Sequence, residues 1–218
     1  MIQIPAHISY ATHLTNDSFA DTEDSSQLHL GIIHGDRFRD DYSRALIHLA
    51  NLFLKTNAPD PLDSIICDSM HPNLDAISSF LTAYLTDKPI SAQAFPEATV
   101  SSGSTTINRV LGALTGNLTI NTGGSLLDAL FFAASEADSR RCRCHLFFGE
   151  WRTHLPRENR QLTHVVIEPS LTETLTFDRT PIQPRKSVLV EIFGESIDFK
   201  NLSHSPTDAG YFKYVSVN

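Results

Sequence analysis

The sequence has few basic residues, no long apolar run and few cysteines. Its 17 Lys and Arg residues are outnumbered by 25 acidic residues, the net charge is −8, and no basic stripe is present. Because nucleic-acid binding depends on basic side chains that neutralise phosphates, we expect no nucleic-acid partner. No segment approaches the roughly 18 apolar residues that a spanning helix requires, and the amino terminus lacks a signal-peptide pattern. We therefore expect a cytoplasmic protein without a membrane span.

The cysteines are odd in number, so they form no complete disulfide framework. They are Cys67, Cys142 and Cys144. The run Cys142-Arg143-Cys144-His145 could suggest a metal site, but two ligands one residue apart on a strand point to opposite faces. A second pair of ligands is missing from the sequence. We expect neither a metal nor another cofactor.

The first half of the chain alternates between strand and helix patterns. With 218 residues, 41% of them hydrophobic, the chain has enough apolar material for one sizeable core. Polar residues at 16–27 predict an exposed loop after a short first strand. Apolar residues at three- and four-residue steps predict helices over 39–55 and 74–84, and the apolar segment 64–67 predicts a buried strand between them.

The second half continues this alternation and then becomes rich in strands. Residues 95–106 are expected to be irregular, and a helix is expected through Val110 and Leu114. Another helix begins at Leu126. Strands are predicted at 118–121, 145–148, 164–168 and 187–193. Strands alternating with helices favour a mostly parallel sheet that is covered on both faces.

A tight turn, Thr122-Gly123-Gly124-Ser125, joins the strand at 118–121 to the following helix. The hydroxyl of Thr122 or Ser125 is available to cap that helix. Backbone N–H groups at a helix amino terminus can lower the pKa of a thiol and hold an oxyanion, so enzymes mount nucleophiles at such turns. The segment resembles the ketosynthase pattern of a strand, a Thr-Ala-Cys-Ser-like elbow and a helix. In that register Gly124 occupies the position of the cysteine.

Other segments resemble ketosynthases in the same order and spacing. Residues 88–95 resemble the Ser-Pro-x-x-Phe segment, with Ala92 in place of the proline, and 101–112 resemble the helix before the active-site strand. Residues 66–72 occupy the place of a glycine-rich junction, and Phe147-Phe148-Gly149-Glu150 resembles the strand that ends in Gly-Gly-Glu or Gly-Ala-Glu. The resemblance covers about 65–151.

The resemblance implies an α/β fold, namely a thiolase-like half. This is a layered α/β/α domain with a mixed, mostly parallel five-stranded sheet and a short C-terminal β-rich extension. We expect a single domain over 1–218, with a core at about 28–155 and the extension at 156–218.

The resemblance also implies that the chain has no catalytic residue of its own. A full ketosynthase is considerably longer, and its second half supplies two histidines and a lysine. Short or inactivated chains of this kind include the chain-length factors of type II polyketide systems, which pair with an active ketosynthase and shape its acyl pocket. We expect such a heterodimer here, with acyl carrier protein engaged through the complex, and the nearest kind is the shortened factor of aryl-polyene-type pathways.

The same resemblance implies which residues act. The strand before the elbow forms the dimer interface, with Leu118, Thr119, Ile120 and Asn121. Residues at the end of the acyl pocket are Met70, Leu74 and Phe95. For these three apolar residues, ordinary core packing is the competing interpretation.

An alternative function is a stand-alone acyl thioester hydrolase or acyltransferase that uses Ser125 or Cys67. Ser125 lacks the Gly-x-Ser-x-Gly frame, because Leu127 fills its last position. Helix capping explains a serine at this place without catalysis. The two functions differ in whether the chain acts alone or with a partner.

Overall fold

The computed structural model describes residues 2–15, 39–90, 92, 94–151, 160–178 and 213–216. The strands are β1 (Ile2–Ile4), β2 (Ala6–Thr15), β3 (Ser64–Asp68), β4 (Asn117–Ile120), β5 (Cys144–Glu150), β6 (Gln161–Pro169), β7 (Leu175–Asp178) and β8 (Lys213–Ser216). The helices are α2 (Asp41–Leu54), α3 (Leu74–Leu85), the 3₁₀ helix η2 (Phe95–Ala98), α4 (Ser102–Leu111) and α5 (Leu126–Arg140). The predicted loop at 16–27 and the predicted strand at 187–193 lie outside the described residues.

The main sheet has five strands in the order β2-β6-β5-β3-β4. β3 pairs in parallel with β4 and β5, whereas β6 pairs antiparallel with β5 and β2. The predicted mixed five-stranded sheet is thereby confirmed. Two strands of this sheet, β2 and β6, lie outside the expected core bounds of 28–155.

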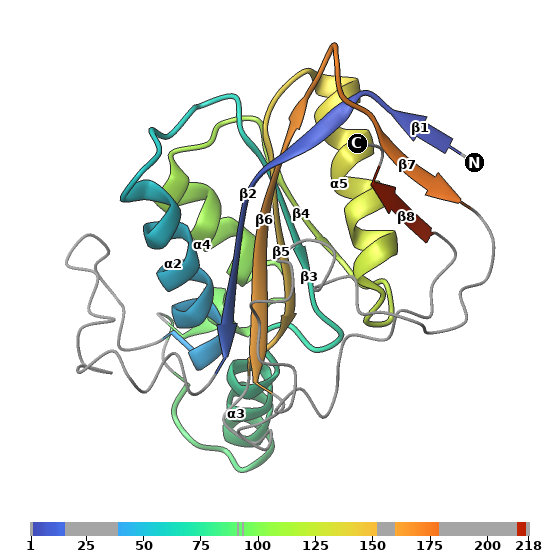
Figure 1. Cartoon of the computed structure of the whole chain (residues 1–218). Helices are drawn as coiled ribbons and strands as arrows, with labels where there is room; N and C mark the ends of the chain where they lie inside the picture. Colours follow the sequence, from blue (N-terminus) through green and yellow to red (C-terminus); the bar gives the residue numbers. More distant parts are fainter. Residues whose placement is uncertain are drawn as a thin grey trace.

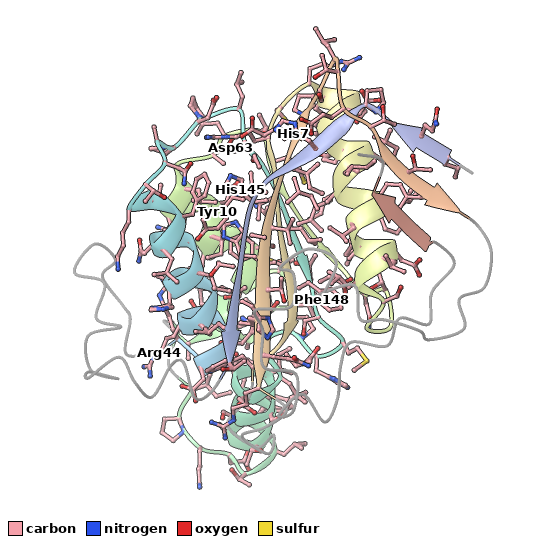
Figure 2. All side chains as sticks on the ribbon, viewed as in Figure 1. His7, Tyr10, Arg44, Asp63, His145 and Phe148 are labelled. Atoms are coloured by element: carbon pink, nitrogen blue, oxygen red, sulfur yellow. The ribbon has the colours of Figure 1, made fainter. Side chains whose placement is uncertain are left out.

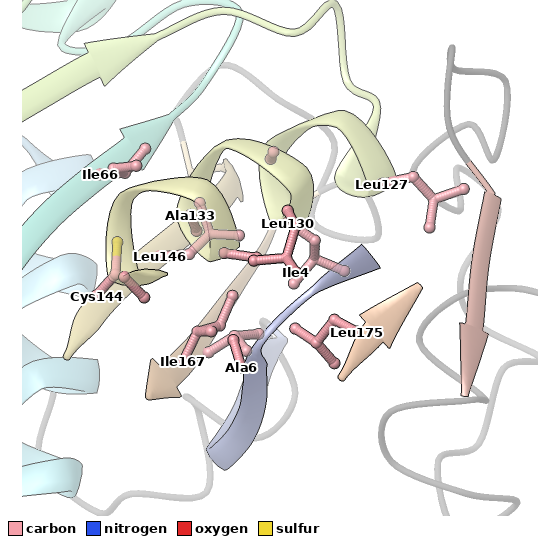
Figure 3. Packing of buried hydrophobic residues seen from close by; sticks show 14 of the residues in the cluster. Ile4, Ala6, Ile66, Leu127, Leu130, Ala133, Cys144, Leu146, Ile167 and Leu175 are labelled. Atoms are coloured by element: carbon pink, nitrogen blue, oxygen red, sulfur yellow. The ribbon is translucent and has the colours of Figure 1, made fainter. Parts of the chain in front are cut away.

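The elements form layers around the sheet (Figure 1). α2 and α4 cover one face and share a core with Phe147 and Val166. α5 covers the other face, and the three-stranded sheet β1-β7-β8 contributes Ile4, Leu175 and Phe177 to the core around it (Figure 3). Of the expected β-rich extension at 156–218, β7 and β8 belong to this small sheet together with the amino-terminal β1, whereas β6 belongs to the main sheet.

Helix ends follow from local chemistry. The Asp40 side chain accepts a hydrogen bond from the Ser43 N–H (2.9 Å) and caps α2. α4 ends at Leu111 because Gly112 adopts a left-handed conformation with φ 67°. The expectation that this helix continues to Leu114 is therefore wrong, and Leu114 is 83% exposed.

α3 forms where the sequence predicts it but buries none of its residues. Leu81 and Tyr84, which share the apolar side of the helix, are 50% and 66% exposed. Its apolar periodicity therefore predicts the helix correctly but not its packing, since this side has no cover in the part of the chain that the structure describes. None of the helices in the described ranges is long and apolar enough to cross a membrane.

A buried polar network closes the end of the sheet opposite α3, where Figure 2 shows Asp63 and His145. Arg143 donates to both carboxylate oxygens of Asp63 at 2.8 Å, and Nε2 of His145 lies 3.1 Å from Asp63. Nδ1 of His145 lies 3.0 Å from Nε2 of His164, whose ring stacks on Phe147 with centroids 4.1 Å apart. Each polar group thus finds a partner inside the core.

Candidate functional site at the carboxyl ends of the parallel strands

The parallel strands β3, β4 and β5 end on the same side of the sheet, toward α3 (Figure 1). In α/β sheets, ligands bind beyond the carboxyl ends of parallel strands. Here β3 ends at Asp68, β5 ends at Glu150, and β4 leads into the elbow at 121–125. The sequence-predicted elbow therefore lies beside two carboxylates.

The elbow is tied to the end of β3 through Thr122. The Thr122 N–H donates to the Asp68 carboxylate at 3.1 Å, and the Thr122 hydroxyl bonds to the other oxygen of that carboxylate. The same hydroxyl lies 3.0 Å from the Ser125 carbonyl oxygen. Ser125 then caps α5, since its hydroxyl accepts a hydrogen bond from the Asp128 N–H at 3.3 Å.

Gly124 stands in the middle of this elbow with φ 87°. Residues other than glycine are strained at such a positive φ, so glycine suits this backbone conformation. The strand-turn-helix junction that the sequence predicts is present, and position 124 carries no side chain.

The two carboxylates hold different loops. Asp68 holds the elbow, and burial, together with the negative charges of Glu150 and Asp128, raises its pKa to about 6 against the opposing effect of its Thr122 hydrogen bonds. Glu150 holds the loop between β3 and α3. Its Oε1 accepts hydrogen bonds from the Ser69 hydroxyl (2.6 Å) and the Met70 N–H (2.5 Å).

The predicted pocket residues lie in the loop after β3, in α3 and in η2. Met70 is in the loop after β3 and is 45% exposed, Leu74 begins α3, and Phe95 begins η2 and is 59% exposed. The Phe95 ring contacts Phe80 of α3, with centroids 5.6 Å apart. Core packing does not account for Met70 or Phe95, and the acyl-pocket role of the three residues stays a prediction.

A separate cavity of about 390 Å³ lies between α2, α3 and η2. Its lining combines the apolar Phe80 and Ile90 with the acidic Asp40, Asp75 and Glu97. Met70, Leu74 and Phe95 do not line it, so it is a different feature from the predicted acyl pocket.

The predicted interface strand, β4, is one of the two edge strands of the sheet in the described residues, the other being β2. The side of β4 toward α4 is filled, because the Ser104 hydroxyl lies 2.8 Å from the Asn117 side chain and 3.0 Å from the Thr119 hydroxyl. The other side opens onto a groove of about 280 Å³ against α5, lined by Leu118, Ile120 and Phe132 among others. Leu118 is 49% exposed and Phe132 is 50% exposed.

Ser125 and Cys67 are poorly placed as nucleophiles. Each is 1% exposed, and the Ser125 hydroxyl is used by the helix cap. Burial raises the pKa of the Cys67 thiol well above its usual range, with a smaller contribution from Asp68. Neither side chain is hydrogen-bonded to a histidine in the described ranges.

Comparisons with known proteins were made at three levels. Neither a protein-family model nor a curated protein matches the chain. Among solved structures, a ketosynthase (ApeO) in complex with its chain length factor (ApeC) from Xenorhabdus doucetiae matches with a TM-score of 0.62 and 12% identity, over 88% of this chain and 91% of that chain. The fold is ketosynthase-like.

A second structure agrees with the first. The ishigamide ketosynthase/chain length factor matches with a TM-score of 0.58 and 13% identity, over 81% of this chain and 64% of that chain. At such identities the likeness is one of fold. The expected thiolase-like α/β fold is thereby confirmed.

The sequence patterns do not predict that Asp68 and Glu150 lie at the same end of the sheet. In the sequence, Asp68 is part of the 66–72 junction and Glu150 ends the 147–150 strand motif. A usable signal was present, because each is a carboxylate that directly ends a buried apolar strand. Parallel pairing of β3 with β5 then brings the two strand ends to one side of the sheet.

Proposed function

We propose that this chain is a noncatalytic, ketosynthase-like subunit of the chain-length-factor type. It pairs with an active ketosynthase and forms part of the wall of its acyl pocket during type II polyketide or fatty-acid-like elongation. The observation that carries this proposal is an elbow with a complete backbone and helix cap but with Gly124 at the nucleophile position. Without a thiol there, position 124 offers no group to form an acyl intermediate.

The structural neighbours support a two-chain arrangement. Both are named as a ketosynthase with a chain length factor, and the first matches nearly the full length of both chains compared. Acyl carrier protein would then deliver its substrate to the partner rather than to Gly124. More narrowly, we propose that the chain is a shortened chain-length factor of an aryl-polyene-type pathway.

The edge strand β4 supports the proposed site of pairing. A strand at the edge of a sheet offers backbone donors and acceptors to another strand, and Leu118 and Ile120 add apolar surface beside it. Thr119 and Asn121 complete the proposed interface segment. A partner seated here would cover the groove against α5.

The exposed apolar residues beyond the strand ends support the proposed pocket wall. Met70 and Phe95 are both exposed in the isolated chain, and a partner subunit would cover them. Leu74 begins α3, directly after the loop that carries Met70. In the heterodimer these residues would meet the growing acyl chain.

The experiment is co-expression with the ketosynthase encoded by a neighbouring gene. Leu118→Glu places a charge at the proposed interface, and Leu171→Glu, at a residue that is 97% exposed in the turn between β6 and β7, is the matched control. We expect Leu118→Glu to weaken pairing at least about tenfold by calorimetry, since a central interface residue contributes more than 1 kcal/mol. The melting temperature of the isolated chain should stay unchanged.

Pairing by Leu118→Glu that equals the wild type would contradict the interface. Products that are the same with and without this chain in a reconstituted system would contradict the function itself. Turnover of an acyl thioester by the isolated chain would favour the stand-alone enzyme.

A further inference from the structure

One carboxylate, that of Glu150, binds the first three residues of the loop that carries Met70. Oε1 of Glu150 lies 2.6 Å from the Ser69 hydroxyl, 2.5 Å from the Met70 nitrogen and 3.3 Å from the His71 nitrogen. The Ser69 hydroxyl also accepts from the His71 N–H at 3.1 Å. Charge-assisted hydrogen bonds to a carboxylate are stronger than neutral ones, so three consecutive residues are held from one point.

Glu150 is itself mounted on a rigid element. It ends β5, where it pairs with Gln161 of β6. Gly149, with φ 128°, keeps this pairing close, because a Cβ atom there would collide with the Gln161 carbonyl oxygen. The carboxylate is therefore a fixed point relative to the sheet, and the Met70 loop is the part that takes its position from it.

The Met70 loop and the elbow are connected through the adjacent residues Asp68 and Ser69. Ser69, which bonds to Glu150, directly follows Asp68, which bonds to Thr122 of the elbow. Ser69 is 3% exposed, whereas the Met70 side chain next to it is 45% exposed. A buried tether thus leaves one flexible apolar side chain pointing outward at a set distance from the elbow.

We propose that Glu150 is a positioning residue that fixes where Met70 lies and thereby sets the length of acyl chain that the paired ketosynthase produces. The chain-length part rests on the proposed function. Glu150 acts only through the loop and does not itself touch the acyl chain. A tether that serves stability alone would leave product length unaffected.

The first test measures the position of the loop in the isolated chain. The three native cysteines are buried, so a nitroxide on Met70→Cys labels one accessible thiol. Glu150→Ala should add a mobile component to the electron paramagnetic resonance spectrum. Glu150→Gln keeps an oxygen that accepts from Ser69 and the Met70 N–H, so its spectrum should stay close to that of the parent. Identical spectra for Glu150→Ala and its parent would overturn the tether.

The second test measures products with unlabelled chains, the partner ketosynthase and acyl carrier protein. Glu150→Ala should shift the principal product by at least one extension unit, and Glu150→Gln should restore the wild-type length. Ser69→Ala, which removes one donor, should act in the same direction with a smaller shift. Glu173→Ala, in the exposed turn before β7, is the control and should change nothing.

The two levels of the proposal fail in different ways. If this chain is required for elongation but Glu150→Ala and Ser69→Ala leave the product distribution unchanged, Glu150 does not set length. If products are unchanged when the chain is omitted, the proposed function fails, whereas the nitroxide spectra still decide whether Glu150 holds the loop.

Discussion

The two ends of β3 each carry a buried aspartate, and their surroundings are opposite. Asp63, just before the strand, and Asp68, at its carboxyl end, are both 1% exposed. Burial alone would raise the pKa of Asp63, but hydrogen bonds from His145 and Arg143 bring it below its usual value. Asp68 has only the amide and hydroxyl of Thr122, and its pKa is raised to about 6.

The covering of the two ends differs in the same way. At the Asp63 end, the Phe53 ring of α2 packs edge-on against His145 with centroids 4.8 Å apart, and α2 buries most of its apolar side. At the Asp68 end, no residue of α3 is fully buried. At the Asp63 end, charged groups are paired and apolar side chains are buried within the chain. At the Asp68 end, a buried carboxylate lacks a basic partner among the described residues and apolar side chains are exposed. Sites that break the rules of stability in this way are where function is expected.

The largest change in the free energy of unfolding should follow from removing the Asp63 carboxylate. Asp63→Ala leaves Arg143 and the buried His145 without their carboxylate. Removing one partner of a buried ion pair costs about 3–5 kcal/mol, and we expect a value near the lower limit because the Arg143 side chain is 21% exposed. Urea unfolding of the isolated chain at pH 7 measures this loss.

The control is the surface pair of Asp138 with Arg141, 3.0 Å apart, whose side chains are 32% and 62% exposed. Asp138→Ala should cost less than about 1 kcal/mol. If both variants lose the same free energy of unfolding, the buried Asp63 network is no more stabilising than a surface ion pair. The contrast between the two ends of β3 would then be wrong.

A smaller effect of opposite sign is expected from Asp68→Asn. The folded protein binds a proton at Asp68 more tightly than the unfolded chain does, so this group lowers stability as the pH rises from about 4 to about 6. Asparagine still accepts from the Thr122 N–H, and its amide can donate to the Thr122 hydroxyl. The variant should therefore be more stable than the wild type by about 1–2 kcal/mol at pH 8.

The pH dependence is the decisive part of this measurement. Unfolding free energies at pH 8, 6 and 4 should show a gain that shrinks and vanishes, since a protonated Asp68 resembles asparagine in charge. A gain of the same size at all three pH values would mean that ionisation of Asp68 is not its cause.

Much of this fold could be predicted from periodicity and the glycine-rich elbow. The helices α2, α3 and α5 and the strands β3 and β4 follow from apolar spacing, because local pattern and tertiary role agree there. The same spacing suggests that α3 is covered like α2, and this is wrong. Periodicity reports which side of a helix is apolar but not whether the chain supplies a surface to cover it.

The polar clusters were harder to predict for a different reason. Asp63, His145 and His164 are far apart in sequence and meet only through the pairing of β3, β5 and β6. An isolated histidine on an apolar strand gives no sign of such a partner. For Asp68 and Glu150, the sequence predicts the turn between β4 and α5, but the pairing register of β3 with β4 and β5 is needed to place the two carboxylates at the same end of the sheet.

The smallest effect should come from Ser125, whose helix cap contributes to stability at the Asp68 end of β3. Ser125→Ala removes the cap of α5 and should cost about 1 kcal/mol in urea unfolding. Ser139→Ala, an exposed serine in the last turn of the same helix, is the control and should change stability by less than about 0.5 kcal/mol. Because the hydroxyl is buried and already bonded to the Asp128 N–H, neither variant should change acyl-thioester hydrolysis. If the wild type hydrolyses an acyl thioester and Ser125→Ala alone loses that activity, the Asp68 end of β3 is an active site of its own rather than a surface for a partner.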